Sequence, residues 1–220
     1  MERFFDSQLD DLKRLILNMG GHVELALDTA MASLNAKDVN QLAKVHEIEQ
    51  KINQEHINVD VACTDLLAKQ GPVAKDLRLI VSIIKINTDL ERMGDQSVNI
   101  AYTSKDYLSR GVLPQIQLIH KMGLVVKNIV KESLDCFVKA DVDLAKKVLM
   151  MDDEIDAFKQ QVFDEIVAHM KKNPQDIEAG LDLILIARNL ERLGDHATNI
   201  AEDVIFAFTG RDVRHSAQVK

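Results

Sequence analysis

The sequence predicts an all-α protein, a tandem repeat of two three-helix bundles with six long antiparallel helices. Composition is the first reason, because hydrophobic residues make up 46% of the 220 residues and aromatic residues only 4%. The apolar content is therefore almost entirely aliphatic, as in helices that pack through aliphatic ridges. Three prolines and nine glycines are also too few for the many turns of a β-sandwich or barrel.

The second reason is an internal repeat. Residues 90–101 recur as residues 190–201, an offset of 100, and eight of the twelve paired positions are identical. Upstream the correspondence continues at an offset of 103 residues. We therefore expect a duplication, with a first bundle at residues 1–110 and a second at residues 111–220.

The first unit is predicted to contain three helices. Apolar residues recur every three or four positions over residues 5–34 and predict the first helix. Asp38 suits the N-cap of a second helix over residues 38–69. Pro72 follows the end of that helix, and a third helix continues to about Arg110.

The second unit repeats this organisation, with helices predicted near residues 113–139, 141–172 and 174–209. Pro114 and Pro174 fall at helix starts, where the first turn tolerates proline. Long helices joined by short turns must lie antiparallel, which gives two bundles of three helices.

The charge of the chain excludes one class of partner. There are 27 Lys and Arg against 35 Asp and Glu, a formal net charge of −8. The chain therefore lacks the basic surface of a general nucleic-acid binder. Residues 1–6 contain no apolar segment of a signal peptide, and no apolar stretch approaches the roughly 18 residues that span a membrane. We expect a cytoplasmic protein.

The duplicated segment carries paired carboxylates. Glu91 and Asp95 stand one helical turn apart on one face of the third helix, and the pair recurs as Glu191 and Asp195. Like charges at this spacing destabilise a helix by roughly 0.2–0.5 kcal/mol, and a cation bound between the carboxylates would remove that repulsion. The alternative is a solvated face on which each glutamate pairs with the arginine that follows it.

A glycine lies inside each motif, at Gly94 and Gly194. Glycine in a helix interior costs up to about 1 kcal/mol relative to alanine, so its recurrence needs a reason. The missing side chain would allow close approach of either a neighbouring backbone or a bulky ion cluster.

The second helix of each unit supplies a further acidic residue at an equivalent register. An antiparallel arrangement would bring that residue towards the paired carboxylates of the third helix. An oxygen-only site of this kind suits magnesium, manganese, calcium or iron. The predicted metal ligands are Glu49, Glu91 and Asp95 in the first unit, and Asp152, Glu191 and Asp195 in the second.

Several segments resemble one protein family. Asp-Leu-Arg-Leu at 76–79, Ile-Ile-Lys at 83–85 and Leu-Glu-Arg-Met-Gly-Asp at 90–95 resemble the PhoU family of phosphate-specific transport system accessory proteins. Residues 187–200 look like the second repeat of that family, and the resemblance extends over nearly the whole chain.

The resemblance implies two three-helix bundles whose acidic motifs bind divalent or trivalent metal ions. Iron, manganese or magnesium is expected, as separate ions or as multinuclear clusters, with Glu91, Asp95, Glu191 and Asp195 as the motif residues. One departure is that Asp89 of the first copy matches an asparagine in the second, which implies that the two sites differ in charge.

The resemblance also implies regulation and no enzymatic activity. Proteins of this family couple the phosphate ABC transporter to a sensor histidine kinase. The expected partners are therefore the ATPase subunit of that transporter and the kinase, with repression of the phosphate regulon and restrained uptake when phosphate is plentiful. A homodimer is expected, peripheral to the membrane only through these partners.

Two other classes compete with this interpretation. A carboxylate-bridged di-iron oxidase needs Glu-x-x-His on two helices, and no such spacing occurs in the chain. A Walker motif is also absent, so no phosphate cradle for nucleotide hydrolysis is predicted. The remaining alternative is a helical adaptor protein without metal.

Overall fold

The all-α prediction is confirmed by the computed structural model, which describes residues 4–34 and 40–214. These residues form six α-helices and one short 3₁₀ helix, and no strand occurs among them. The α-helices are α1 (Phe4–Ser33), α2 (Asn40–Gln70), α3 (Ala74–Arg110), α4 (Ile116–Lys139), α5 (Val142–Lys172) and α6 (Ile177–Thr209).

The start of α5 shows how its local sequence sets a boundary. Asp141 is the N-cap, because its carboxylate accepts hydrogen bonds from the backbone N–H groups of Asp143 and Leu144. Asp38, its counterpart in the first unit, lies outside the described residues, so the predicted cap at that position has no structural outcome.

The start of α6 differs from the prediction. Pro174 opens the 3₁₀ turn Pro174–Asp176, and the α-helix itself begins at Ile177. Asp176 in this turn lies 2.7 Å, Oδ2 to Nε2, from His169 of α5. The 3₁₀ turn and the His169–Asp176 pair hold the start of α6 against α5. The position of Pro174 alone did not indicate this turn.

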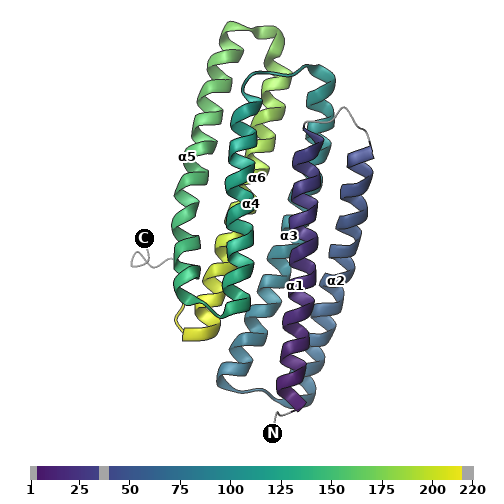
Figure 1. Ribbon diagram of the computed structural model, residues 1–220, viewed down its shortest axis with the longest axis vertical. Coiled ribbons are helices and arrows are strands. Elements are labelled where there is room, and N and C mark those ends of the chain that lie inside the picture. Colours follow the sequence, from purple (N-terminus) through teal and green to yellow (C-terminus); the bar gives the residue numbers. More distant parts are fainter. Residues whose placement is uncertain (1–3, 35–39, 215–220) are drawn as a thin grey trace.

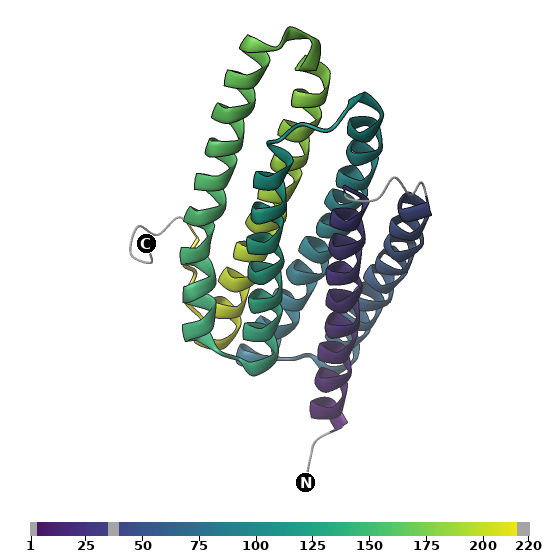
Figure 2. The same cartoon turned by 45° about the horizontal axis from the view of Figure 1, so that its top comes forward.

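The helices form two neighbouring bundles, α1 to α3 and α4 to α6. Figures 1 and 2 show α1 and α4 side by side in one layer, α3 and α6 behind them, and α2 and α5 at the two outer edges. The predicted architecture of two three-helix bundles is therefore confirmed. The most extensive contact between any two helices joins the bundles, and it lies between α3 and α6.

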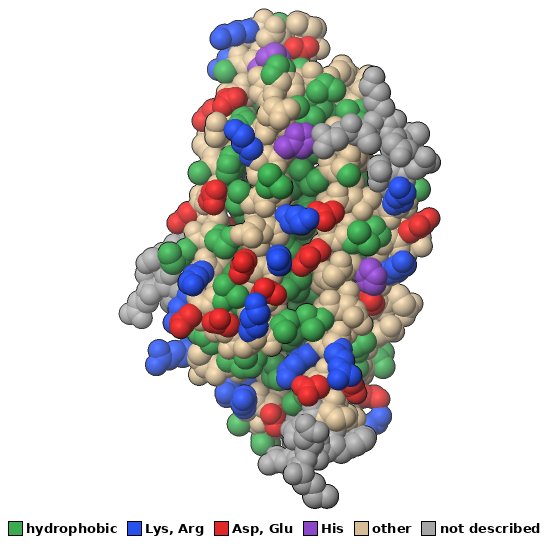
Figure 3. All heavy atoms as spheres, in the orientation of Figure 1, with side chains coloured by type: hydrophobic (Ala, Val, Ile, Leu, Met, Phe, Trp, Pro, Cys, Tyr) green, Lys and Arg blue, Asp and Glu red, His purple; other side chains and the backbone are tan. Residues whose placement is uncertain are grey.

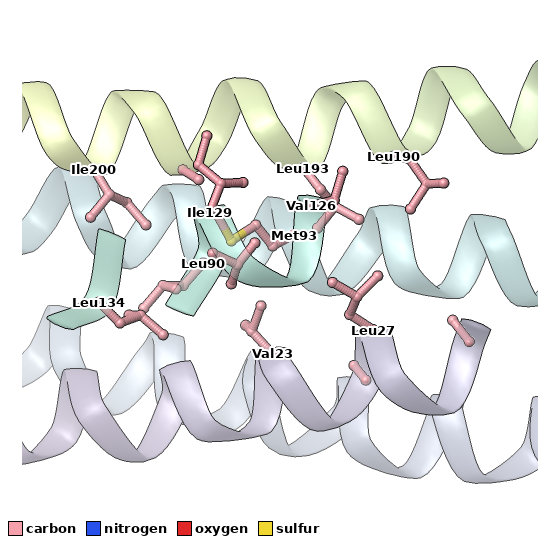
Figure 4. Close-up of a cluster of buried hydrophobic side chains, with 14 of the residues drawn as sticks. Val23, Leu27, Leu90, Met93, Val126, Ile129, Leu134, Leu190, Leu193 and Ile200 are labelled. Atoms are coloured by element: carbon pink, nitrogen blue, oxygen red, sulfur yellow. The ribbon is translucent and has the colours of Figure 1, made fainter. Parts of the chain in front are cut away.

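The core runs through both bundles without interruption. Fully buried aliphatic side chains from all six helices belong to one contiguous cluster. Figure 4 shows its centre, where side chains of α1, α3, α4 and α6 meet. The labelled residues are Val23, Leu27, Leu90, Met93, Val126, Ile129, Leu134, Leu190, Leu193 and Ile200.

Two equivalent contacts close the crossing between α1 and α4. A Cβ atom at Gly20 would lie 2.8 Å from Cδ1 of Leu134, and Met31 covers Gly123 in the same way. Gly20 and Gly123 are partners in the repeat, as are Met31 and Leu134. The two bundles therefore pack about an approximate two-fold axis.

Ion pairs mark the edges of the contact between α3 and α6. Nζ of Lys85 lies 3.0 Å from Oδ1 of Asp203, and Arg110 pairs with Asp182. Residues near the start of α6 thus meet the end of α3, so these two helices run antiparallel. Both aspartates are almost completely buried, which makes their cationic partners necessary.

The described helices contain no segment with the length and apolarity needed to cross a membrane. On the face drawn in Figure 3, acidic, basic and hydrophobic side chains are interspersed over the helices.

Substitution of Gly194 by leucine tests the tight contact between α5 and α6. A Cβ atom at Gly194 would lie 2.7 Å from Cδ1 of Ile155, so Gly194→Leu is expected to lower the free energy of unfolding by about 1–3 kcal/mol. The control is Gly21→Leu, because nothing lies within 4 Å of a Cβ atom there. That change is expected to raise stability by roughly 0.5–1 kcal/mol. Urea unfolding followed by circular dichroism measures both, and an unchanged midpoint for Gly194→Leu would contradict the contact.

Candidate functional site

The paired carboxylates of the repeat lie midway along α3 and α6. Helix α2 packs against α3 and α5 against α6, so each second helix neighbours the motif of its own unit. The side chain of Glu91 is 22% exposed and that of Glu191 18%, whereas Asp95 is 36% exposed. The glutamates are therefore the more buried members of the two pairs.

In the second unit, the structure brings the three predicted ligands into one electrostatic environment. Burial is the main cause that raises the pKa of Asp195 to about 6, followed by repulsion from Glu191 and Asp152. His196 partly opposes this effect, and Asp156 adds a smaller repulsion. Asp152 of α5 therefore lies close enough to Asp195 to influence its ionisation.

A lysine that sequence reasoning missed lies in the same cluster. Nζ of Lys159 on α5 lies 2.6 Å from Oε1 of Glu191, and this hydrogen bond raises the pKa of the lysine. An ammonium group thus already neutralises one of the predicted ligands. The sequence does contain a signal for this residue, because the same repeat position carries a basic side chain in both units, Lys159 in the second and His56 in the first.

The first unit is arranged differently. Arg92 lies between the two carboxylates, with Nε 3.4 Å from Oε2 of Glu91 and a guanidinium nitrogen 3.2 Å from Oδ2 of Asp95. Oε2 of Glu91 is nevertheless buried and accepts no hydrogen bond. Glu49 accepts a hydrogen bond from Asn53 on its own helix. The arginine pairing expected of a solvated face is therefore present in this unit.

Each motif glycine lies where a side chain of the neighbouring helix packs against the backbone of the motif helix. A Cβ atom at Gly94 would lie 3.1 Å from Cδ1 of Ile52, and Gly194 meets Ile155 in the same way. The isoleucines are repeat partners on α2 and α5. Each glycine therefore admits a buried isoleucine of the neighbouring helix, rather than a backbone segment.

Asp89, the residue that breaks the repeat, lies at the contact between the bundles. Its Oδ1 lies 2.8 Å from Nδ1 of His196 and accepts a hydrogen bond from the amide of Asn199 at 3.2 Å. Both partners belong to α6, so Asp89 links the two bundles. The imidazole of His196 therefore takes part in the contact between the two bundles.

Two features of the described residues fit a bound cation, and two oppose it. The buried Oε2 of Glu91, which accepts no hydrogen bond, and the crowded carboxylates around Asp195 would both be stabilised by further positive charge. Lys159, however, already supplies such a charge in the second unit. Among residues 4–34 and 40–214, no three His, Cys, Asp or Glu side chains converge in an arrangement able to hold an ion.

The fold and the duplicated motif define a helical repeat protein with an acidic segment in each half. The sequence profile described as the PhoU domain matches the chain twice, at residues 16–103 and 119–204. The chain therefore belongs to the PhoU family, as the resemblance of its motifs indicated.

Curated relatives match along almost the whole chain. The phosphate-specific transport system accessory protein PhoU homolog of Pseudomonas aeruginosa is 39% identical, over 96% of this chain and 88% of its own length. The protein of the same name from Pseudomonas putida is 38% identical, over 96% of this chain and 83% of its own length.

Solved structures share the fold. The crystal structure of PhoU from Pseudomonas aeruginosa superposes with a TM-score of 0.91 and 38% identity, covering 94% of this chain and 100% of that one. The phosphate transport system regulatory protein PhoU from Streptococcus pneumoniae gives a TM-score of 0.89 and 28% identity, covering 95% and 99%.

Proposed function

We propose that the protein is an accessory regulator of phosphate transport that couples the phosphate ABC transporter to a sensor histidine kinase. It docks on the ATPase subunit of the transporter and on the kinase, represses the phosphate regulon and restrains phosphate uptake when phosphate is plentiful. The observation that carries this proposal is the 39% identity, over 96% of the chain, to a protein named a phosphate-specific transport system accessory protein.

The fold suits a scaffold. Because one core runs through both bundles, the long exposed helix faces of the two units keep a fixed relation. A rigid body of this kind can hold two partners at a constant separation. Within the same proposal, the protein is a cytoplasmic homodimer without enzymatic activity that reaches the membrane only through its partners. The net charge of −8 argues against nucleic acid among these partners.

We further propose that the duplicated carboxylates bind iron, manganese or magnesium ions. A bound ion would add positive charge to carboxylates that Arg92 and Lys159 neutralise only in part, and would thereby fix α2 against α3 and α5 against α6. Support comes from the buried Oε2 of Glu91, which accepts no hydrogen bond, and from the raised pKa of Asp195. The ligands would be Glu49, Glu91, Asp95, Asp152, Glu191 and Asp195.

Metal analysis of protein purified without chelator tests the ligand assignment. Wild type is expected to retain metal, and the double variant Asp95→Ala with Asp195→Ala to lose most of it, because each unit loses one motif carboxylate. Circular dichroism checks that both proteins are folded. Equal, near-zero metal in both would contradict the assignment and would favour a metal-free helical adaptor, in line with the Lys159–Glu191 pair.

Deletion of the gene tests the regulatory role. A phosphate-starvation reporter is expected to become active in high phosphate in the deletion strain, because the repressing scaffold is gone, and to fall silent again when the wild-type gene is restored. Capture of the purified ATPase subunit and kinase by the purified protein provides the biochemical counterpart. A reporter that stays silent in high phosphate after deletion would contradict the proposed function.

A further inference from the structure

We propose that a groove between α5 and α6 is the docking site for an acidic amphipathic helix of a partner protein. This inference rests on the scaffold function proposed above and names the surface and the partner chemistry that the scaffold uses. We call the surface the α5–α6 groove. It has a volume of about 520 Å³, and Val162, Phe163, Ile184 and Ala187 form its apolar lining.

The two units differ at the position of the groove, although their backbones are related by the repeat. In the first unit the space between α2 and α3 is closed by Asn87, whose buried amide donates to the carbonyl oxygen of His56 at 3.0 Å and to Oδ1 of Asp60 at 2.9 Å. The second unit has Ala187 in place of Asn87 and Phe163 in place of Asp60. The polar bridge between the helices is therefore missing in the second unit.

The loss of this bridge leaves apolar surface uncovered. Phe163 is 48% exposed, which is unusual for a phenylalanine in a chain with few aromatic residues. Ile177, Leu181 and Leu185 lie at intervals of one helical turn on the face of α6 that carries Arg188 and Arg192, and each is between 44% and 49% exposed. Exposed apolar side chains grouped beside a groove are typical of interaction sites.

Two arginines border the groove without a partner. Arg188 and Arg192 stand one helical turn apart on α6, and neither forms a hydrogen bond or ion pair with any residue in the described part of the chain. The residue that corresponds to Arg192 in the first unit is Arg92. Arg92 is not free, because it contacts both carboxylates of its motif. The position of Arg188 holds Thr88 there. The second unit alone thus presents two free guanidinium groups.

Charge and shape together select the occupant. Among the residues that line the groove, Lys159 pairs with Glu191, so Arg188 and Arg192 outnumber the one other lining carboxylate, Asp195. Asp152 and Asp156 lie near Asp195 but outside the lining, so an acidic ligand is favoured at the end of the groove that the two arginines border. The lining on α6 runs from Ile184 to Asp195, about 16 Å or three helical turns, which is an elongated surface that suits a helix lying along it. An amphipathic helix fits by placing its apolar face on the groove and its carboxylates on the arginines.

Peptide binding tests the groove. The probe is a fluorescein-labelled 15-residue helix with leucines at i, i+4, i+7 and i+11 and glutamates beside them, and the reference probe carries lysine in place of glutamate. Fluorescence anisotropy is expected to show at least tenfold tighter binding of the acidic probe to the wild-type chain. The variants are Arg188→Glu, which reverses a rim charge, and Ala187→Asn with Phe163→Asp, which copies the closed first unit.

Both variants are expected to weaken binding of the acidic probe at least tenfold. Thr88→Glu, the matched change in the first unit, is expected to leave it unaltered. Thermal unfolding checks that every variant is folded, and Arg188→Glu alters only an exposed side chain. Equal binding to wild type and variants, or no binding to wild type, would overturn the proposal. Wild-type dimers that the groove variants abolish, without any binding of the probe, would also overturn it and assign the groove to a second copy of the chain.

The reporter assay separates this inference from the proposed function. If deletion activates the reporter and both groove variants repress as well as wild type does, the groove inference fails and the scaffold stands. If deletion leaves the reporter silent while the acidic probe still requires the groove, the regulatory role fails and the docking site stands.

Discussion

The antiparallel contact between α3 and α6 is the constraint on which the rest of the structure depends. Each of these helices forms a wall of its own bundle and also the junction to the other bundle, so a single core serves both. The Lys85–Asp203 pair fixes their register, and the Asp89–His196 link lies between the two motifs. Because the same helices carry the duplicated carboxylates, the distance between the two acidic clusters is set by this contact.

Within this common backbone the two halves have become chemically different. The first unit closes the space between its second and third helices with Asn87 and keeps its motif arginine paired with carboxylates. The second unit places Lys159 among its carboxylates and leaves Arg188 beside an open apolar groove. Duplication thus supplies two similar faces, and a few substitutions give them different binding properties. This division is compatible with the proposed coupling of two unlike partners.

Local features of the fold were predictable, because apolar periodicity, prolines and caps act within one helix. The six helices, their approximate ends and the two bundles follow from these signals and from the repeat. The contact between α3 and α6 did not follow, since periodicity reveals apolar faces but not which faces meet. For the same reason Gly94 and Gly194 indicated a close approach without identifying Ile52 and Ile155 as the approaching groups. The acidic residues of the repeat do not reveal Lys159. A comparison of basic residues would have drawn attention to Lys159, whose repeat partner is His56.

Differential scanning calorimetry of the intact protein tests most directly whether the two bundles form one cooperative body. If they share one core, unfolding should give a single transition whose calorimetric enthalpy equals the van't Hoff enthalpy. Two separate transitions, or a calorimetric enthalpy well above the van't Hoff value, would show that each bundle unfolds with a core of its own. That result would contradict the proposed rigid scaffold, in which the two motifs and the α5–α6 groove keep a fixed relation.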